Sequence, residues 1–136
     1  MEVRIETTYG ATKKFAAAGL EAFNRQHQTG SPPKSFAVTV RENEAARGAL
    51  VAEGVGQWMV FTLLWVEDQY RRRGFGTSLL RAAEAESKKR GAVGALVDTY
   101  SFQAPAFYRT NGYTAYGQVD DFPEAGMTWF RFKKAL

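Results

Sequence analysis

The chain has 136 residues, of which 45% are hydrophobic and 24% charged, with a formal net charge of +4 and no cysteine. This composition predicts one globular domain over residues 1–136 in the cytoplasm, and it excludes a disulfide-stapled scaffold. The single histidine, His27, argues against a His/Cys zinc site, so no metal is expected. The longest apolar run, Met59 to Val66, is too short to cross a bilayer, so no membrane partner is expected.

The first predicted elements are a strand and a helix. Glu2 to Tyr9 alternates in polarity as a short strand does. Lys14 to Gln28 carries apolar residues at helical spacing, and Gly30 to Pro33 ends that helix. Three strands joined by short turns are predicted next, at Phe36–Arg41, Gly48–Glu53 and Gln57–Val66.

The second half of the chain predicts alternating helices and strands. Thr77 to Arg90 is an amphipathic helix that Gly91 ends. The remaining elements are a short helix at Pro105–Asn111 and strands at Ala95–Thr99, Tyr113–Val119 and Met127–Phe132. Three successive strands, then a strand–helix–strand–helix stretch and a terminal hairpin, predict an α/β (α+β) fold with one mixed sheet and helices on both faces.

A glycine- and arginine-rich loop lies between the apolar strand and the amphipathic helix. It reads Arg71-Arg72-Arg73-Gly74-Phe75-Gly76-Thr77, and main-chain amides with positive charge at a helix N-terminus suit a pyrophosphate. A dinucleotide fingerprint fits poorly, because Leu79 takes the third glycine position and the loop is too long. A Walker A loop needs Gly-Lys-Ser/Thr, which is absent. The remaining pattern, R-x-x-G-x-G, is by itself also compatible with a solvated turn.

A second motif further along the chain narrows these readings. Phe107-Tyr108 is followed by Gly112-Tyr113, and the pair of motifs resembles the GNAT superfamily of acyl-CoA-dependent N-acyltransferases from Phe36 to the C-terminus. The resemblance implies six to seven mostly antiparallel strands, with a splayed central parallel pair and about three helices. It also implies direct transfer of an acetyl group from acetyl-CoA to a primary amine of a small molecule or peptide.

The resemblance further implies which residues hold coenzyme A. The loop amides from Arg72 to Thr77 would bind the pyrophosphate, and the pantetheine arm would lie along the main chain of Leu64 and Val66. That arm would fill the notch where the strand ending at Val66 splays from Ala95–Thr99. The implied cofactor-binding residues are Leu64, Val66, Arg71, Arg72, Arg73, Gly74, Phe75, Gly76, Thr77, Ser101 and Phe107.

Tyr108 matches the family's general acid, which protonates the leaving thiolate, although a purely packing role stays open. Ser101 stands where relatives often carry asparagine, and either a cofactor contact or a helix cap would explain it. The strand from Met59 to Thr62 lacks the base found in many relatives. The carboxylates nearest the expected cleft are Glu53, Glu67 and Asp98, each more typical of a solvated position.

Several features leave the acceptor and the partners open. Trp58, Trp65 and Trp129 favour packing over a substrate platform, and the acidic loop at 120–124 favours a plain hairpin loop over a cation site. No aromatic residues alternate with the basic runs, so nucleic acid is not the expected partner. Exposed edges at the terminal hairpin make a homodimer plausible. The rival functions are a catalytically inactive acyl-CoA-binding sensor or scaffold, and a nucleic-acid-binding protein.

Overall fold

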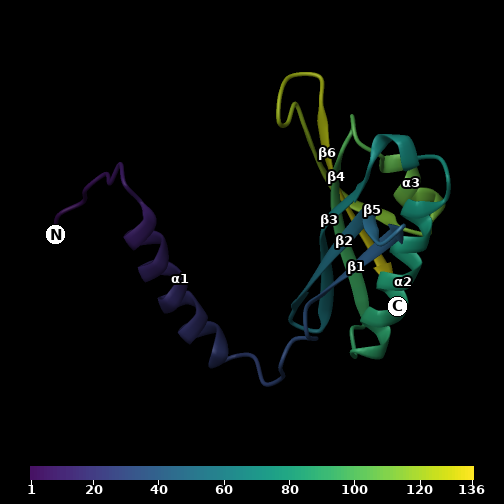
Figure 1. The fold of residues 1–136 in the computed structure, drawn as a ribbon. Helices are drawn as coiled ribbons and strands as arrows, with labels where there is room; N and C mark the ends of the chain where they lie inside the picture. Colours follow the sequence, from purple (N-terminus) through teal and green to yellow (C-terminus); the bar gives the residue numbers. More distant parts are fainter. The chain divides into compact units, whose positions relative to one another are not determined.

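The computed structural model describes residues 1–136 as two units, Met1–Gly30 and Ser31–Leu136 (Figure 1). The expectation of one domain over the whole chain stays a prediction. None of the helices has the length and hydrophobicity that a bilayer crossing requires.

The first unit contains one helix, α1 (Gly10–Arg25), in which no residue is buried. The helix begins before the predicted Lys14 and ends before the predicted Gln28. Its earlier start was not predicted because its first turn has no apolar periodicity. The Lys13 N–H already donates to the Tyr9 carbonyl at 2.8 Å. The predicted strand at residues 2–9 is wrong. Alternating polarity needs a neighbouring strand to complete its hydrogen bonds, and residues 1–30 contain no second strand.

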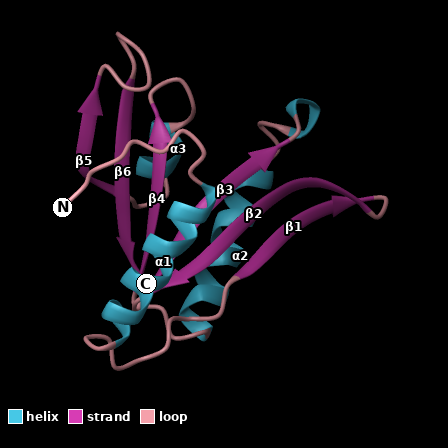
Figure 2. Cartoon of the chain, turned by 90° about the vertical axis from the view of Figure 1, so that its left-hand side faces the viewer, coloured by secondary structure: helices cyan, strands magenta, loops and turns pink.

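The second unit is built on a six-stranded mixed sheet. Its order is β1-β2-β3-β4-β6-β5, and only β3 and β4 run parallel (Figure 2). The strands are β1 (Phe36–Glu42), β2 (Ala45–Val55), β3 (Trp58–Val66), β4 (Gly94–Tyr100), β5 (Thr114–Asp120) and β6 (Thr128–Ala135). Each strand overlaps its predicted range, and the mixed sheet with one central parallel pair is confirmed.

The central parallel pair separates before either strand ends. The β3–β4 ladder runs from Trp58 opposite Gly94 to Phe61 opposite Val97. Beyond it β3 continues to Val66, and Figure 2 shows it leaning away from β4. The main-chain edge of β3 that faces β4 is therefore unpaired over its second half, which is the splay that the family resemblance implied.

Two helices cover one face of this sheet, α2 (Phe75–Lys89) and α3 (Pro105–Thr110) (Figure 1). Leu79, Leu80 and Ala83 of α2 are buried in the core, and the Tyr108 ring of α3 lies 5.9 Å from that of Phe132 on β6. The expectation of helices on both faces is therefore not met within residues 31–136. The main core residues on this side are Leu50, Ala52, Met59, Phe61, Ala95, Val97 and Phe132.

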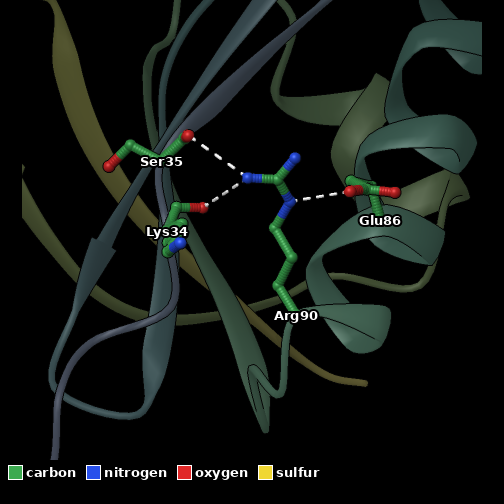
Figure 3. Close-up of polar contacts among 4 residues, drawn as sticks. All are labelled: Lys34, Ser35, Glu86 and Arg90. Carbon is green, nitrogen blue, oxygen red and sulfur yellow. Dashed lines mark hydrogen bonds and ion pairs between the residues drawn. The ribbon is translucent and has the colours of Figure 1, made fainter.

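A single arginine joins the end of α2 to the start of β1 (Figure 3). Arg90 donates from Nε to Glu86 at 2.7 Å and from Nη1 to the main-chain carbonyls of Lys34 at 3.1 Å and Ser35 at 3.4 Å. Its guanidinium also lies 4.7 Å over the Phe36 ring. These contacts fix the edge strand to the helix that begins at the arginine-rich loop.

Candidate functional site

A cavity of about 710 Å³ occupies the notch between β3 and β4. It extends from the loop that precedes α2 to the buried ring of Tyr108, so groups far apart in the sequence share one space. Its lining residues are Phe61, Thr62, Leu63, Leu64, Trp65, Val66, Tyr70, Arg71, Arg72, Gly74, Phe75, Gly76, Thr77, Val97, Asp98, Thr99, Phe102, Gln103, Ala104, Phe107 and Tyr108.

The N-terminus of α2 presents unpaired main-chain amides to this cavity. Its N-cap, Gly74, has a φ of +81° and provides no side-chain cap, and the first helical hydrogen bond runs from Ser78 to Gly74. The amides of Phe75, Gly76 and Thr77 therefore have no partner within the helix. Such amides, together with the helix dipole, bind phosphate groups.

Backbone conformation and small side chains keep this loop open. Arg72 has a φ of +59°, and Gly74 also lies in the left-handed region. Left-handed residues of this kind are typical of loops whose main-chain amides bind anions. A Cβ at Gly76 would lie 3.5 Å from the Phe107 ring, so a glycine there leaves room beside the helix terminus.

The three arginines of the loop have different surroundings. Arg71 and Arg72 line the cavity, and Arg73 does not. The guanidinium of Arg73 lies 3.6 Å from the Glu42 carboxylate and 5.1 Å over the Tyr70 ring. Arg71 is paired as well, through Nη1 with the Asp68 carboxylate. The arginines on the cavity side, where the pyrophosphate is expected, are Arg71 and Arg72.

Leu64 and Val66 line the cavity on the unpaired part of β3. Their expected role in holding the pantetheine arm stays a prediction. The Val66 carbonyl oxygen accepts a hydrogen bond from Arg71 Nε at 2.9 Å. An extended ligand arm in the notch would therefore find main-chain groups of β3 along its length, with Arg71 at the end nearest the loop.

Tyr108 lies at the inner end of the cavity. It is 6% exposed, and its ring packs edge-on against Phe107 and Tyr113 at 5.2 and 5.7 Å. Burial raises the pKa of Tyr108 to about 12, because the phenolate would lose its hydration. The phenol is thus protonated throughout the neutral range, as a proton donor requires, and Phe107 lines the same cavity.

Ser101 lies outside the cavity lining, and its polar groups are used elsewhere. Its Oγ accepts from the Thr128 amide at 3.0 Å, and its own amide donates to the Thr128 carbonyl at 2.8 Å. The alternative role as a helix cap is wrong, since α3 has no side-chain cap at its N-terminus. Ser101 ties the end of β4 to β6.

Of the three carboxylates considered as bases, only Asp98 lines the cavity. It lies 3.4 Å from the Arg131 guanidinium. Glu67 is paired with Arg47 at 3.4 Å, and Glu53 lies away from the lining. The cavity therefore contains one carboxylate, on the side of the sheet opposite to α2.

Phe102 and Gln103 are among the lining residues that sequence reasoning missed. Gln103 Oε1 accepts from the Tyr100 amide at 2.9 Å and from Thr99 Oγ1 at 3.1 Å, which shapes the turn after β4. Neither residue belongs to a motif, and only the fold of the turn brings them to the cavity.

Comparisons with known proteins give a consistent result. The acetyltransferase (GNAT) domain family matches residues 32–115, more than half of the chain. Blasticidin-S acetyltransferase of Streptomyces morookaense is 39% identical over 77 residues, which cover 56% of this chain and 57% of that enzyme. The chain thus matches little more than half of that relative's length.

Solved structures share the fold. A crystal structure of an acetyltransferase from Bacillus cereus is similar with a TM-score of 0.89 and 28% identity, covering 98% of both chains. A Bacillus anthracis structure, solved in complex with acetyl coenzyme A, has a TM-score of 0.68 at 17% identity and covers 76% of this chain and 64% of its own. The second likeness concerns the fold alone.

Proposed function

This chain belongs to the GNAT acetyltransferase family, and we propose that it transfers an acetyl group from acetyl-CoA directly to a primary amine of a small molecule. The observation that carries the proposal is the single cavity that joins the free amides of α2 to Tyr108. A phosphate-binding end and a proton donor in one space are what a coenzyme A thioester needs at its two ends.

The donor half of the site is built mainly from main-chain groups. The amides of Phe75, Gly76 and Thr77 bind the pyrophosphate, with Arg71 and Arg72 supplying positive charge. The pantetheine arm lies along β3 beside Leu64 and Val66, where the sheet is unpaired. Phe107 packs beside this arm and separates it from the core.

The chemistry follows from the position and the pKa of Tyr108. The amine nitrogen attacks the thioester carbonyl carbon, the C–S bond breaks, and the leaving sulfur takes a proton. With a pKa of about 12, Tyr108 is a weak acid that is always protonated, so it stabilises the developing thiolate by hydrogen bonding and partial proton transfer. The neutral amine forms the C–N bond, and the proton that its nitrogen then loses balances the one that the thiolate takes.

The acceptor amine must be deprotonated before it attacks. Asp98 is the carboxylate that lines the cavity, and it accepts this proton either directly or through a water molecule. A small molecule is the preferred acceptor class because the relative from Streptomyces morookaense is named for one, blasticidin S. A peptide acceptor is the less favoured reading of the same site.

A transfer assay with acetyl-CoA and a panel of small primary amines tests the function. Wild-type protein should acetylate at least one amine, and Tyr108→Phe should lower its turnover while still binding acetyl-CoA in isothermal titration calorimetry. Binding of acetyl-CoA without transfer to any amine or peptide would reject the enzyme and favour an acyl-CoA-binding sensor, a reading supported by the absence of a carboxylate among residues 59–62 of β3.

A further inference from the structure

Four aromatic rings gather beside the cavity, where β4 ends and β6 begins. We call Tyr100, Phe102, Phe122 and Trp129 the aromatic platform. Tyr100 and Phe102 are stacked 5.3 Å apart with only 8° between their planes. Phe122 joins them, 6.1 Å from Tyr100 and 5.5 Å from Trp129. Three separate segments of the chain thus meet in one patch of rings.

The platform continues from the cavity on the sheet face opposite to α2. Phe102 is itself part of the cavity lining. Tyr100 pairs with Trp129 across the β4–β6 ladder, and Asp98 lies two residues before Tyr100, so all three side chains are on the same face. A molecule that rests on the platform would therefore lie next to Asp98 at the mouth of the cavity.

The platform exposes ring surface that the core does not use. Phe102 is 59% exposed and Phe122 is 41% exposed, although both are strongly apolar. The exposed fractions of Phe102 and Phe122 leave ring surface accessible to a ligand beside the stacked pairs. Rings of this kind bind planar π-systems in preference to saturated rings of equal size, because quadrupole interactions add to area burial.

We infer that the acceptor amine of this protein carries a planar aromatic or heteroaromatic group, which stacks on the aromatic platform while the amine enters the cavity beside Asp98. This inference rests on the proposed function, since it names the substrate class of the same site. It places the donor and the acceptor on opposite faces of the sheet, joined through the notch between β3 and β4.

A matched pair of amines tests the inference. 2-Phenylethylamine and 2-cyclohexylethylamine have the same carbon skeleton and the same amine, and differ in the planarity of the ring. Wild-type kcat/KM should be about five- to tenfold higher for the phenyl compound, as expected for ring stacking. Phe122→Leu should reduce this preference toward unity. Equal use of both amines, or an equal loss of both in the variant, would overturn the inference.

Tyr116→Leu is the control, because Tyr116 is an exposed aromatic residue outside both the platform and the cavity. It should keep the wild-type preference for the phenyl compound. Melting temperatures establish that the Phe122→Leu and Tyr116→Leu variants fold. Both side chains are exposed, so neither substitution is expected to prevent folding.

Equilibrium binding to the protein loaded with coenzyme A separates the two proposals. Tryptophan fluorescence, to which Trp129 of the platform contributes, should show tighter binding of the phenyl than of the cyclohexyl compound. Preferential phenyl binding without acetylation of any amine would reject the proposed function while supporting the platform as a site for planar aromatic groups. Acetylation without a phenyl preference, or the absence of binding by either amine, would reject the inference.

Discussion

Arg71 donates a hydrogen bond from Nε to the main-chain carbonyl oxygen of Val66 at 2.9 Å, and its guanidinium lies 4.5 Å over the Trp65 ring. The loop before α2 is thereby tied back to the end of β3. Because Arg71 also lines the cavity, it both shapes the loop and faces the space where the donor is proposed to bind. Its removal is therefore expected to affect donor binding first.

Arg71→Ala should raise the Kd of acetyl-CoA about tenfold, because a charged hydrogen-bond donor contributes about 1.5 kcal/mol. Calorimetric titration with acetyl-CoA measures this change. Arg73→Ala is the matched control, since that guanidinium pairs with Glu42 outside the cavity. A loss of affinity in Arg73→Ala as large as in Arg71→Ala would contradict this assignment.

Tyr108→Phe should lower kcat by roughly 10²- to 10⁴-fold, the usual contribution of a positioned general acid, with little change in the KM for acetyl-CoA. Tyr113→Phe removes the same hydroxyl from a neighbouring ring, where it donates to Glu84 Oε2 at 3.0 Å instead of lining the cavity. That control should lose stability and keep most of its turnover. Steady-state kinetics and urea unfolding of both variants distinguish rate from stability effects.

The raised pKa of Tyr108 predicts that stability falls in alkali. The unfolded phenol ionises near pH 10 and the folded one near 12, so the unfolded state loses its proton first as the pH rises. The contribution of the protonated Tyr108 phenol to the free energy of unfolding is complete below pH 10. It is lost between about pH 10 and 12, and the loss is roughly 2–3 kcal/mol at most. Burial also raises the pKa of Tyr113 and adds to the same trend.

Urea unfolding at pH 9 and pH 11 measures this dependence. Tyr108→Phe should show a smaller loss of stability between the two values than the wild type. An identical loss in the variant would mean that Tyr108 does not carry the effect.

Gly76→Ala should leave the fold intact and weaken donor binding. The new Cβ would meet the Phe107 ring at an ordinary contact distance of 3.5 Å, and alanine favours a helix by up to about 1 kcal/mol over glycine. The same methyl group would occupy space at the free amides. The melting temperature should stay equal or rise while the Kd of acetyl-CoA increases several-fold, whereas unchanged affinity would place the pyrophosphate elsewhere.

Gly74→Ala should act in the opposite sense on stability. Gly74 has a φ of +81°, which costs an L-residue about 1–2 kcal/mol. A lowered melting temperature is the expected result, and an unchanged one would show that the loop adapts.

Arg90→Ala should destabilise the protein by about 1–2 kcal/mol, because the side chain bonds two main-chain carbonyls at the start of β1. Lys89→Ala, at the neighbouring exposed position, should have little effect. Urea unfolding measures the stability of both variants. Equal unfolding midpoints would show that the Arg90 contacts between α2 and β1 are not important for stability.

The sequence predicted the sheet well because its strands carry their own signals. The apolar run of β3 and the amphipathic pattern of α2 reflect burial that the fold provides. Residues 2–9 show the limit of that reasoning. Their alternation of polar and apolar residues is compatible with one face of a strand, but it does not show that a partner strand exists. The short helix at Asp68–Tyr70 was also missed, because no periodicity marks three residues.

The residues that line the cavity were predictable where their position depends on main chain and motif, and not where it depends on tertiary contacts. The cavity includes the loop glycines and Tyr108, as expected. Arg73 and Ser101 lie elsewhere because Glu42 and Thr128, distant in sequence, bind them. The aromatic platform required the turn after β4 and the loop before β6 to meet, and no local pattern encodes that meeting.

In the proposed function, the early separation of β3 from β4, after Phe61 and Val97, places the two substrates against different kinds of chemical groups. The donor side consists largely of peptide groups, whose hydrogen bonds survive most side-chain exchanges along the strand. The acceptor side consists of side chains, each replaceable without disturbing a ladder. With such a division, the accepted amine could change one residue at a time while the proposed acyl donor stayed the same.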